Sequence, residues 1–307
     1  MATNGLTNGH SESLTELDPA STADFSSNGL VLSKGIILLI HGLWMTPACW
    51  EDWGVYFTNL GYEVLAPGWP GVDDRTVEEI RSNPKALEGL TIHHIISHYE
   101  QIIRGLPSPP ILMGHSFGGL FVQLLLSRGL GRTGVGICPA QPSGVLALKL
   151  STVKASFAIL GNPFTYNKAV PISASRFHYA FANHLTAAES SLLWERYSVP
   201  AAAHVLWQGA LGVVVPGDGK VDWGKKDRAP LLLIAGTRDH IVPMQVVKAA
   251  EKKYHGPAVV DFKVFEGRTH GIVNQEGWEE VADFALGWVE EKMGGSRSEA
   301  RIPFELI

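Results

Sequence analysis

One serine of the sequence lies in a run of small residues that is typical of a catalytic nucleophile. Residues 114–119 read Gly-His-Ser-Phe-Gly-Gly and contain the pattern Gly-x-Ser-x-Gly around Ser116. The apolar run 111–113 precedes the motif and the apolar run 120–126 follows it, as expected when a strand enters the turn and a helix leaves it. Small residues let the strand and the helix approach closely, so that the hydroxyl projects above the sheet. This context favours a nucleophile over a serine in an ordinary glycine-rich turn.

A serine hydroxyl is a weak nucleophile at neutral pH, so it needs a nearby base that a carboxylate orients. We expect the base to be His270, because this histidine follows the last expected strand and precedes the last expected helix. A loop at that point lies at the same sheet edge as the serine turn. Asp239, just past the expected strand 231–236, is the favoured carboxylate, since no acid directly follows the strand that ends at Cys138. Glu266 is the alternative carboxylate.

Attack on a carbonyl creates an oxyanion, which needs hydrogen-bond donors already in place. One donor would be the backbone N–H of Phe117, the residue after the nucleophile. The other should come from the loop after the first core strand, which reads His41-Gly42-Leu43-Trp44. Gly42 lets the chain turn inward, so the N–H of Leu43 is the favoured second donor and that of Trp44 is the alternative. We interpret His41 as a residue that fixes this loop rather than as a second base.

Short apolar runs alternate with amphipathic segments, which predicts a parallel sheet with crossover helices on both faces. Expected strands lie at residues 36–41, 62–66, 110–114, 135–138, 231–236 and 259–265. Expected helices lie at residues 48–60, 91–104, 118–129, 243–254 and 276–292. The last of these repeats its apolar residues at spacings of three and four, so one of its faces should pack on the sheet.

The strand–helix alternation stops after Cys138 and resumes at Leu231. Residues 141–217 contain nine aromatic and only seven charged residues, and helices are expected at 145–160, 174–184 and 187–210. This pattern predicts a helical cap, residues 141–229, inserted into an α/β core made of residues 30–140 and 230–307. Residues 1–29 are rich in Ser, Thr, Asn and Gly, and we expect a flexible tail there.

Aromatic residues near the expected oxyanion loop and in the expected cap could form the walls of an apolar substrate pocket. The competing interpretation is that a small helical cap uses its aromatic residues as its own core. The candidates for substrate contact are Trp44, Trp69, Phe177, Phe181 and Trp207.

The composition favours a small molecule as the partner of this chain. The 25 basic residues are outnumbered by 30 acidic residues and form no dense basic run, so neither nucleic-acid binding nor a polybasic membrane anchor is expected. The longest apolar run, residues 36–40, is too short to span a bilayer. Residues 1–29 lack the basic and apolar segments of a secretion signal, and two cysteines cannot form a disulfide framework. These features predict a cytoplasmic protein.

The sequence resembles the α/β-hydrolase superfamily, and in particular its lidded esterase, lactonase and haloperoxidase-like branch. The resemblance extends over residues 35–292 or so and implies a mostly parallel sheet of about eight strands, flanked by helices, with an inserted helical cap. The two earliest strands of that pattern are poorly visible before Ile36. The residues that carry the resemblance are His41-Gly42, the motif 114–119, Asp239 four residues before Pro243, and His270 followed by Gly271.

The resemblance and the residue types together predict a serine hydrolase that cleaves an ester, lactone or thioester bond of a small apolar or aromatic substrate through an acyl-enzyme. Neither a metal ion nor an organic cofactor is expected. Four alternatives stay open: hydrolysis of a carbon–carbon bond, acyl transfer to another acceptor, perhydrolysis, and a biosynthetic or ligand-binding protein that keeps the fold without hydrolysing its ligand.

Overall fold

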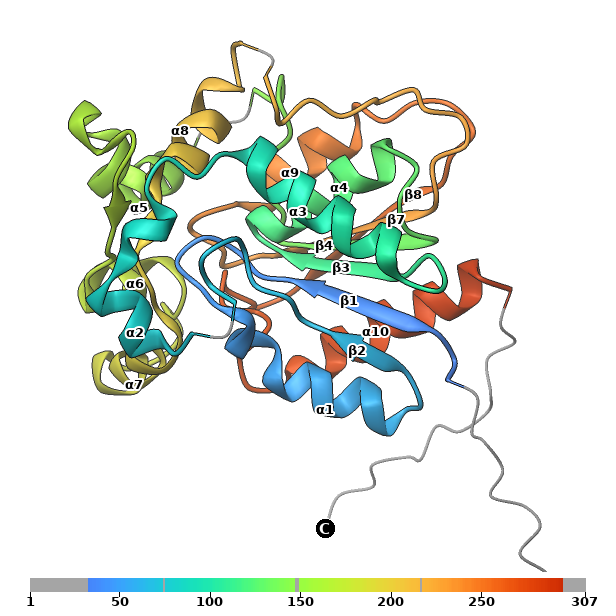
Figure 1. Cartoon of the computed structure of the whole chain (residues 1–307), viewed down its shortest axis with the longest axis horizontal. Helices are drawn as coiled ribbons and strands as arrows, with labels where there is room; N and C mark the ends of the chain where they lie inside the picture. Colours follow the sequence, from blue (N-terminus) through green and yellow to red (C-terminus); the bar gives the residue numbers. More distant parts are fainter. Residues whose placement is uncertain (1–32, 74, 147–148, 216, 295–307) are drawn as a thin grey trace, which may run out of the picture. The chain divides into compact units, whose positions relative to one another are not determined.

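A parallel sheet of six strands forms the centre of the part of the chain that the structure describes. This computed structural model describes residues 33–73, 75–146, 149–215 and 217–294 (Figure 1). The strands lie in the order β2-β1-β3-β4-β7-β8, and every neighbouring pair is parallel. Their bounds are β1 Ile36–Ile40, β2 Glu63–Leu65, β3 Ile111–His115, β4 Thr133–Ile137, β7 Leu231–Gly236 and β8 Val260–Phe265.

The predicted fold class, a mostly parallel sheet flanked by helices, is confirmed. The expected count of about eight strands compares with six strands in the sheet of the described residues. Strands that precede Ile36 would fall outside the described residues, which begin at Ser33. The predicted tail, residues 1–29, also lies outside them.

The inner strands are buried on both faces, which explains their continuous apolar sequences. Every residue of β1, β3 and β4 is buried, and β1 pairs in register with β3, so that Leu38 lies beside Leu112 and Leu39 beside Met113. The edge strands β2 and β8 are only partly buried. The core therefore lies on both sides of the central strands and holds their carboxyl ends firmly.

Helices cover both faces of the sheet. Figure 1 shows α1 and α10 on one face and α3, α4 and α9 on the other. The helix α3 buries Ile92, Ile95, Ile96, Tyr99 and Ile103, a spacing of three and four that matches the turn of an α-helix. None of the described helices is both long and apolar enough to cross a membrane. The bounds are α1 Glu51–Asn59, α3 Ile92–Gly105, α4 Phe117–Ser127, α9 Met244–Glu251 and α10 Trp278–Lys292.

The segment between β4 and β7 forms a group of helices beyond the carboxyl ends of the strands (Figure 1). The described residues of this segment form four α-helices, a 3-10 helix and a short antiparallel pair of strands, joined by irregular chain. The bounds are α5 Leu150–Leu160, η3 Pro163–Thr165, β5 Ala169–Val170, α6 Ala174–Ala180, α7 Ala187–Tyr197, β6 Ala201–Ala202 and α8 Ala203–Leu211.

Several elements differ from the sequence-based expectation. The helix expected over residues 187–210 is two helices, because the chain is extended around Pro200, and the N–H of Val199 donates to the carbonyl of Trp44 (2.9 Å) instead of to a helical carbonyl. The short helices α2 (Val77–Ser82) and η2 (Pro84–Leu87) were not expected. Thr76 and Glu79 form a capping box at the start of α2, which is a signal that the sequence contains.

Candidate active site

Ser116 is the only residue between the end of β3 and the start of α4. Its backbone angles are φ 56° and ψ −120°, a strained conformation for a residue with a side chain. Hydrogen bonds hold this conformation from both sides, because the N–H of Ser116 donates to Ile137 (2.9 Å) and its carbonyl accepts from Ala140 (2.9 Å) and Gly119 (3.0 Å). The serine is therefore fixed at a sharp strand-to-helix turn at the carboxyl end of the sheet.

The glycines of the motif are required by the close approach of backbones around this turn. A Cβ on Gly114 would lie 2.2 Å from the carbonyl oxygen of Gly118, and a Cβ on Gly118 would lie 2.0 Å from the carbonyl oxygen of Ile40. A Cβ on Gly119 would lie 2.7 Å from Cβ of Pro139. Real Cβ atoms do not tolerate such distances, so glycine at these positions lets α4 cross β1 and β3 closely enough to present Ser116.

Asp239 and His270 form a buried hydrogen-bonded pair at the same edge of the sheet. His270 Nδ1 lies 2.7 Å from Asp239 Oδ2. The other carboxylate oxygen, Oδ1, accepts from the N–H groups of Ile241 and Val242, each at 2.8 Å. These bonds orient the carboxylate. The carboxylate in turn favours the tautomer of a neutral imidazole that carries its proton on Nδ1, and in this tautomer Nε2 is unprotonated. His270 Nε2 is buried without a hydrogen-bond partner among the described residues.

The backbone of His270 is held by the histidine of the serine motif. His115 Nε2 lies 2.7 Å from the carbonyl oxygen of His270, and the two ring centres are 4.7 Å apart. Burial, with a smaller effect of the neighbouring His270 ring, holds the pKa of His115 well below its usual range. A neutral His115 therefore donates from Nε2 and connects the serine turn directly to the loop of His270. This contact was not expected from the sequence, in which its only signal is the histidine beside the serine.

The loop after β1 lies against the serine turn. A Cβ added to Gly42 would lie 2.8 Å from Cβ of Ser116 and 3.4 Å from its Oγ, so only a glycine allows this approach. His41 stands next to it and contacts the loop with both ring nitrogens: Nδ1 lies 2.9 Å from the carbonyl of Gly42, and Nε2 accepts from the N–H of Trp69 (3.1 Å). Burial lowers the pKa of His41 to about 4, so the ring is neutral and can donate once and accept once.

Two backbone N–H groups near the serine are free to bind an oxyanion. The N–H of Leu43 donates to no acceptor in the described part of the chain. Phe117 is the first residue of α4, a position at which the N–H has no partner within the helix, and no other described residue accepts from it. The predicted donors Leu43 and Phe117 therefore have no described acceptor, and the N–H of Trp44, the alternative donor, has none either.

Three of the five aromatic residues predicted to contact substrate form a continuous series that ends at His270. The Phe177 and Phe181 rings stack with centres 4.9 Å apart, and Phe181 meets the His270 ring edge-on at 5.1 Å. Trp44 approaches Phe181 at 6.4 Å, and its indole N–H donates to the carbonyl of Val170 (3.2 Å). Trp44 therefore connects the loop after β1 with the segment between β4 and β7.

The other two predicted aromatic residues lie apart from this series. Trp69 is buried, stacks on His41 with ring centres 5.0 Å apart, and lies 5.4 Å from Phe121. Trp207 contacts its own segment, since its indole N–H donates to Thr165 Oγ1 (3.3 Å). Trp69 thus packs behind the loop after β1, and Trp207 packs within the helical group.

The helical group is bonded to the loops that carry the site. The carbonyl of Phe181 accepts from the N–H of Gly271 (3.0 Å) and from Thr269 Oγ1 (2.9 Å), the residues on either side of His270. A Cβ added to Gly209 of α8 would lie 3.0 Å from the Phe117 ring, so α8 lies over the start of α4. With these contacts in place, Ser116 is only 5% exposed.

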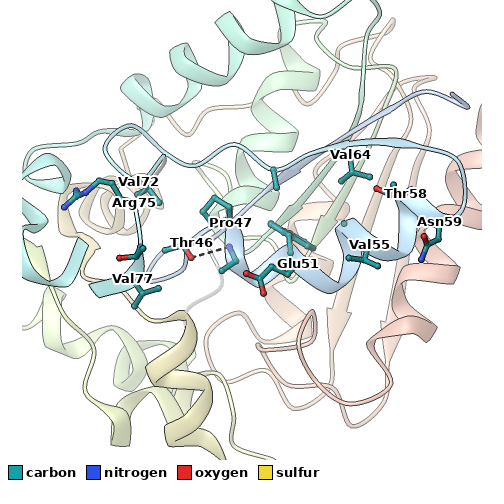
Figure 2. A pocket seen from close by; sticks show the side chains of 15 residues that line it. Thr46, Pro47, Glu51, Val55, Thr58, Asn59, Val64, Val72, Arg75 and Val77 are labelled. Atoms are coloured by element: carbon teal, nitrogen blue, oxygen red, sulfur yellow. Dashed lines mark hydrogen bonds between the residues drawn. The ribbon is translucent and has the colours of Figure 1, made fainter. Parts of the chain in front are cut away.

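A groove of about 810 Å³ lies elsewhere, along α1 and the chain after β2. Figure 2 shows its lining residues, which come from residues 46–77 and include Thr46, Glu51 and Arg75. Ser116, Asp239 and His270 do not line it. The cavity beside Phe177, Phe181 and Gly271 is much smaller, about 10 Å³.

A parallel sheet with a strained serine at a strand–helix turn and an Asp–His pair at the same edge defines the architecture of the α/β hydrolases. A family model described as "Alpha/beta hydrolase family" matches residues 37–284, and the chain belongs to this family. The comparison with curated protein sequences finds no match.

Solved structures share this fold at low sequence identity. A monoacylglycerol lipase from Paleococcus ferrophilus is 19% identical, with a TM-score of 0.57 over 85% of this chain and 95% of the other. A methylesterase from Arabidopsis is 13% identical, with a TM-score of 0.58 over 83% and 99%. The methylketone synthase I of tomato, solved as a variant with beta-ketoheptanoate, is 17% identical, with a TM-score of 0.59 over 84% and 98%.

Proposed function

We propose that the protein is a serine hydrolase that cleaves an ester, lactone or thioester bond of a small apolar or aromatic substrate. The observation that carries the proposal is the buried pair His270–Asp239, joined at 2.7 Å, whose free Nε2 lies at the same sheet edge as the strained turn of Ser116. A neutral imidazole with one nitrogen fixed by a carboxylate and the other unpaired is poised to accept a proton.

The reaction follows from the residue types. His270 Nε2 takes the proton of Ser116 as Oγ bonds to the substrate carbonyl carbon, and the N–H groups of Leu43 and Phe117 bind the oxyanion. His270 then gives the proton to the leaving alkoxide or thiolate, and an acyl-enzyme remains. Water attacks this ester as His270 takes its proton, and His270 returns that proton to Ser116 Oγ as the bond to the acyl carbon breaks and the acid is released. Asp239 stabilises the imidazolium in both steps.

Residues 141–229 act in this proposal as a cap over a core made of residues 30–140 and 230–307. The aromatic series from Phe177 through Phe181 to His270, with Trp44 at its side, supports an apolar or aromatic substrate group at this site. Trp69 and Trp207 would then act through packing. The methylesterase and lipase of similar fold support an ester substrate. Because these two proteins differ in their named activities, the acyl and alcohol groups of the substrate must be identified by experiment.

The test is covalent labelling followed by turnover. A fluorophosphonate probe should label the wild-type protein at Ser116, and the protein should hydrolyse p-nitrophenyl butyrate. Ser116→Ala should abolish both signals, whereas Ser82→Ala, which changes an exposed serine at the end of α2, should abolish neither. A wild-type protein that neither binds the probe nor turns over esters would contradict the proposal and favour a binding or biosynthetic role of the fold.

Products separate hydrolysis from its alternatives. When a small alcohol or amine is added, we expect the acyl-enzyme still to react mainly with water, so that the free acid remains the main product. If the acyl group goes mainly to the added acceptor, the same site is an acyltransferase.

A further inference from the structure

Cys138 lies beside the Asp–His pair, although the proposed mechanism does not use it. It is the first residue after β4, and its N–H donates to the carbonyl of Ile234 in the neighbouring strand β7 (2.8 Å). This position brings it next to the loop that carries Asp239. The Cys138 Sγ, a carboxylate oxygen of Asp239 and a ring nitrogen of His270 all lie within 4.8 Å of one another, and all three residues are buried.

The backbone φ of Cys138 is positive, as it is at Ser116. Among the described residues, three that are not glycine have φ in the left-handed region: Trp44 at 64°, Ser116 at 56° and Cys138 at 44°. Trp44 lies on the loop after β1 and Ser116 is the proposed nucleophile, so two of the three strained residues already belong to the site. A glycine would adopt the conformation of Cys138 without strain. The thiol therefore stands at a position that backbone geometry alone would give to glycine.

A buried thiol beside a carboxylate is most stable when it keeps its proton and acts as a hydrogen-bond donor. A thiolate there would be a second negative charge without water, and both burial and the Asp239 charge raise the pKa of Cys138 well above its usual range. The thiol thus keeps its proton and can donate it in a hydrogen bond. A carboxylate oxygen of Asp239 is an acceptor within 4.8 Å of the thiol.

We propose that Cys138 is a positioning residue whose S–H donates to the Asp239 carboxylate and holds it in the orientation that His270 requires. The inference rests on the proposed roles of Asp239 and His270. Asp239 Oδ1 is held by two backbone N–H groups and Oδ2 by the imidazole. A donor directly after β4 adds a restraint from a further strand end, so the carboxylate is held by the chain after β4, after β7 and after β8 and keeps Oδ2 toward His270 Nδ1.

Three variants separate the donor from the backbone and from packing. With p-nitrophenyl butyrate as substrate, Cys138→Ala and Cys138→Gly should lower kcat about tenfold with little change in KM, because the lost hydrogen bond restrains the carboxylate and does not touch the substrate. Cys138→Ser keeps a donor and should retain kcat within about twofold. If Cys138→Gly, which relieves the positive φ, is as active as wild type, or if Cys138→Ser loses as much as Cys138→Ala, the inference is wrong.

A second measurement needs no turnover. In each variant, proton NMR should follow the low-field Nδ1–H resonance of His270. This resonance should move or broaden in Cys138→Ala and stay near its wild-type position in Cys138→Ser. A resonance that is unchanged in Cys138→Ala would contradict the inference even if activity falls for another reason. Cys49→Ala is the matched control, because Cys49 is equally buried but lies in η1 (Pro47–Trp50), and it should change neither kcat nor the resonance.

The outcomes distinguish this inference from the proposed function. If Ser116 labels with the fluorophosphonate and Ser116→Ala is inactive while the Cys138 variants behave like wild type, only the role of Cys138 fails. If wild-type Ser116 does not label, the proposed function fails first.

Discussion

Burial decides the protonation of two histidines beside the nucleophile turn. The rings of His41 and His115 are fully enclosed, and for both of them the loss of hydration is the main cause of a lowered pKa. Each ring therefore stays neutral and offers one donor and one acceptor nitrogen. His41 uses both of its nitrogens to join the loop after β1 to Trp69, and His115 uses one to hold His270. These two buried histidines thus make mainly structural contacts.

The lowered pKa of His41 predicts a loss of stability in acid. Its folded pKa is about 4 and its ordinary value is 6.5, so between these values the unfolded chain binds a proton that the folded chain does not. The free energy of unfolding therefore falls as the pH is lowered through this window, by about 2 to 3 kcal/mol at pH 4.5 from His41 alone. His115 acts in the same direction.

Urea unfolding at pH 7 and at pH 4.5 measures this effect. We expect His41→Gln, whose amide can also donate and accept, to lose less stability than wild type between the two pH values, with His115 accounting for part of what remains. Between pH 7 and pH 8 the two proteins should change almost in parallel, because unfolded His41 is then at most about one quarter protonated, which changes the free energy of unfolding by less than about 0.2 kcal/mol. An equal acid-induced loss in both proteins would show that His41 is not the titrating group.

Asp239→Asn tests the orientation of the base. The amide would replace an oxygen that accepts from Nδ1 and would favour the tautomer whose Nε2 carries the proton, which cannot take a proton from Ser116. We expect kcat for p-nitrophenyl butyrate to fall by about 10³ to 10⁴, with little change in KM or in melting temperature. Glu266→Gln is the control, because Glu266 bonds to Thr237 and is the alternative carboxylate. A large loss of kcat in Glu266→Gln together with a small loss in Asp239→Asn would show that Glu266, and not Asp239, orients His270.

At the level of elements, the site depends on how closely α4 packs against the strands and how closely the loop after β1 approaches Ser116. Glycine at positions 114, 118 and 42 removes side chains that would collide with backbone or with Ser116. The helix α4 is buried along nearly its whole length, so it cannot shift outward to make room. The geometry of the nucleophile turn is thus a packing property of β1, β3 and α4 together.

Gly42→Ala should impair catalysis more than folding. The added Cβ would lie 2.8 Å from Cβ of Ser116 and 3.1 Å from the carbonyl of His115, so the loop must move away from the nucleophile and take the Leu43 N–H with it. We expect kcat/KM to fall by about 10²-fold or more, as for loss of one oxyanion donor. Gly287→Ala in α10 is the matched control, because its Cβ meets nothing within 4 Å. It should keep full activity and add about 0.5 to 1 kcal/mol of stability.

Kinetics with p-nitrophenyl butyrate and thermal melts of both glycine variants check this prediction. An active Gly42→Ala protein would mean that the loop after β1 contributes no donor to the reaction.

The sequence allowed the sheet and its helices to be predicted within a few residues, because buried parallel strands are continuous apolar runs. It also allowed Asp239 and His270 to be predicted at one edge, since carboxyl ends of parallel strands share an edge, and the structure brings the two side chains into a hydrogen bond. The neighbours of Cys138 could not be predicted, because they depend on the pairing of β4 with β7. The helix α2 was missed because its six residues bury only Ile80, too little for an amphipathic pattern.

For the molecule as a whole, the helical group and the sheet differ in how their apolar residues are used. The strands β1, β3 and β4 are buried throughout, whereas α5 leaves Leu150 90% and Phe157 59% exposed. Fewer buried apolar contacts mean a lower free energy for local opening. At the same time, Ser116 is only 5% exposed, so the proposed function requires part of the structure around it to open for substrate, and we expect this part to be the helical group.

Hydrogen exchange measures that opening directly. Amides of α5 to α8 should exchange faster than those of β1, β3 and β4 in the free protein, because local opening of the helical group requires less free energy than unfolding of the sheet. A phosphonate bound to Ser116 should slow exchange in α6 and in the loop of His270, since an adduct there contacts the aromatic series that ends at His270 and favours the closed state. The edge strand β8 serves as the internal control, because it pairs with β7 and interacts with α9 and α10, and it should exchange alike in both states. If α5 to α8 exchange as slowly as the central strands, or if the adduct leaves α6 unchanged, residues 141–229 do not act as a mobile cap, and substrate must reach Ser116 by another route.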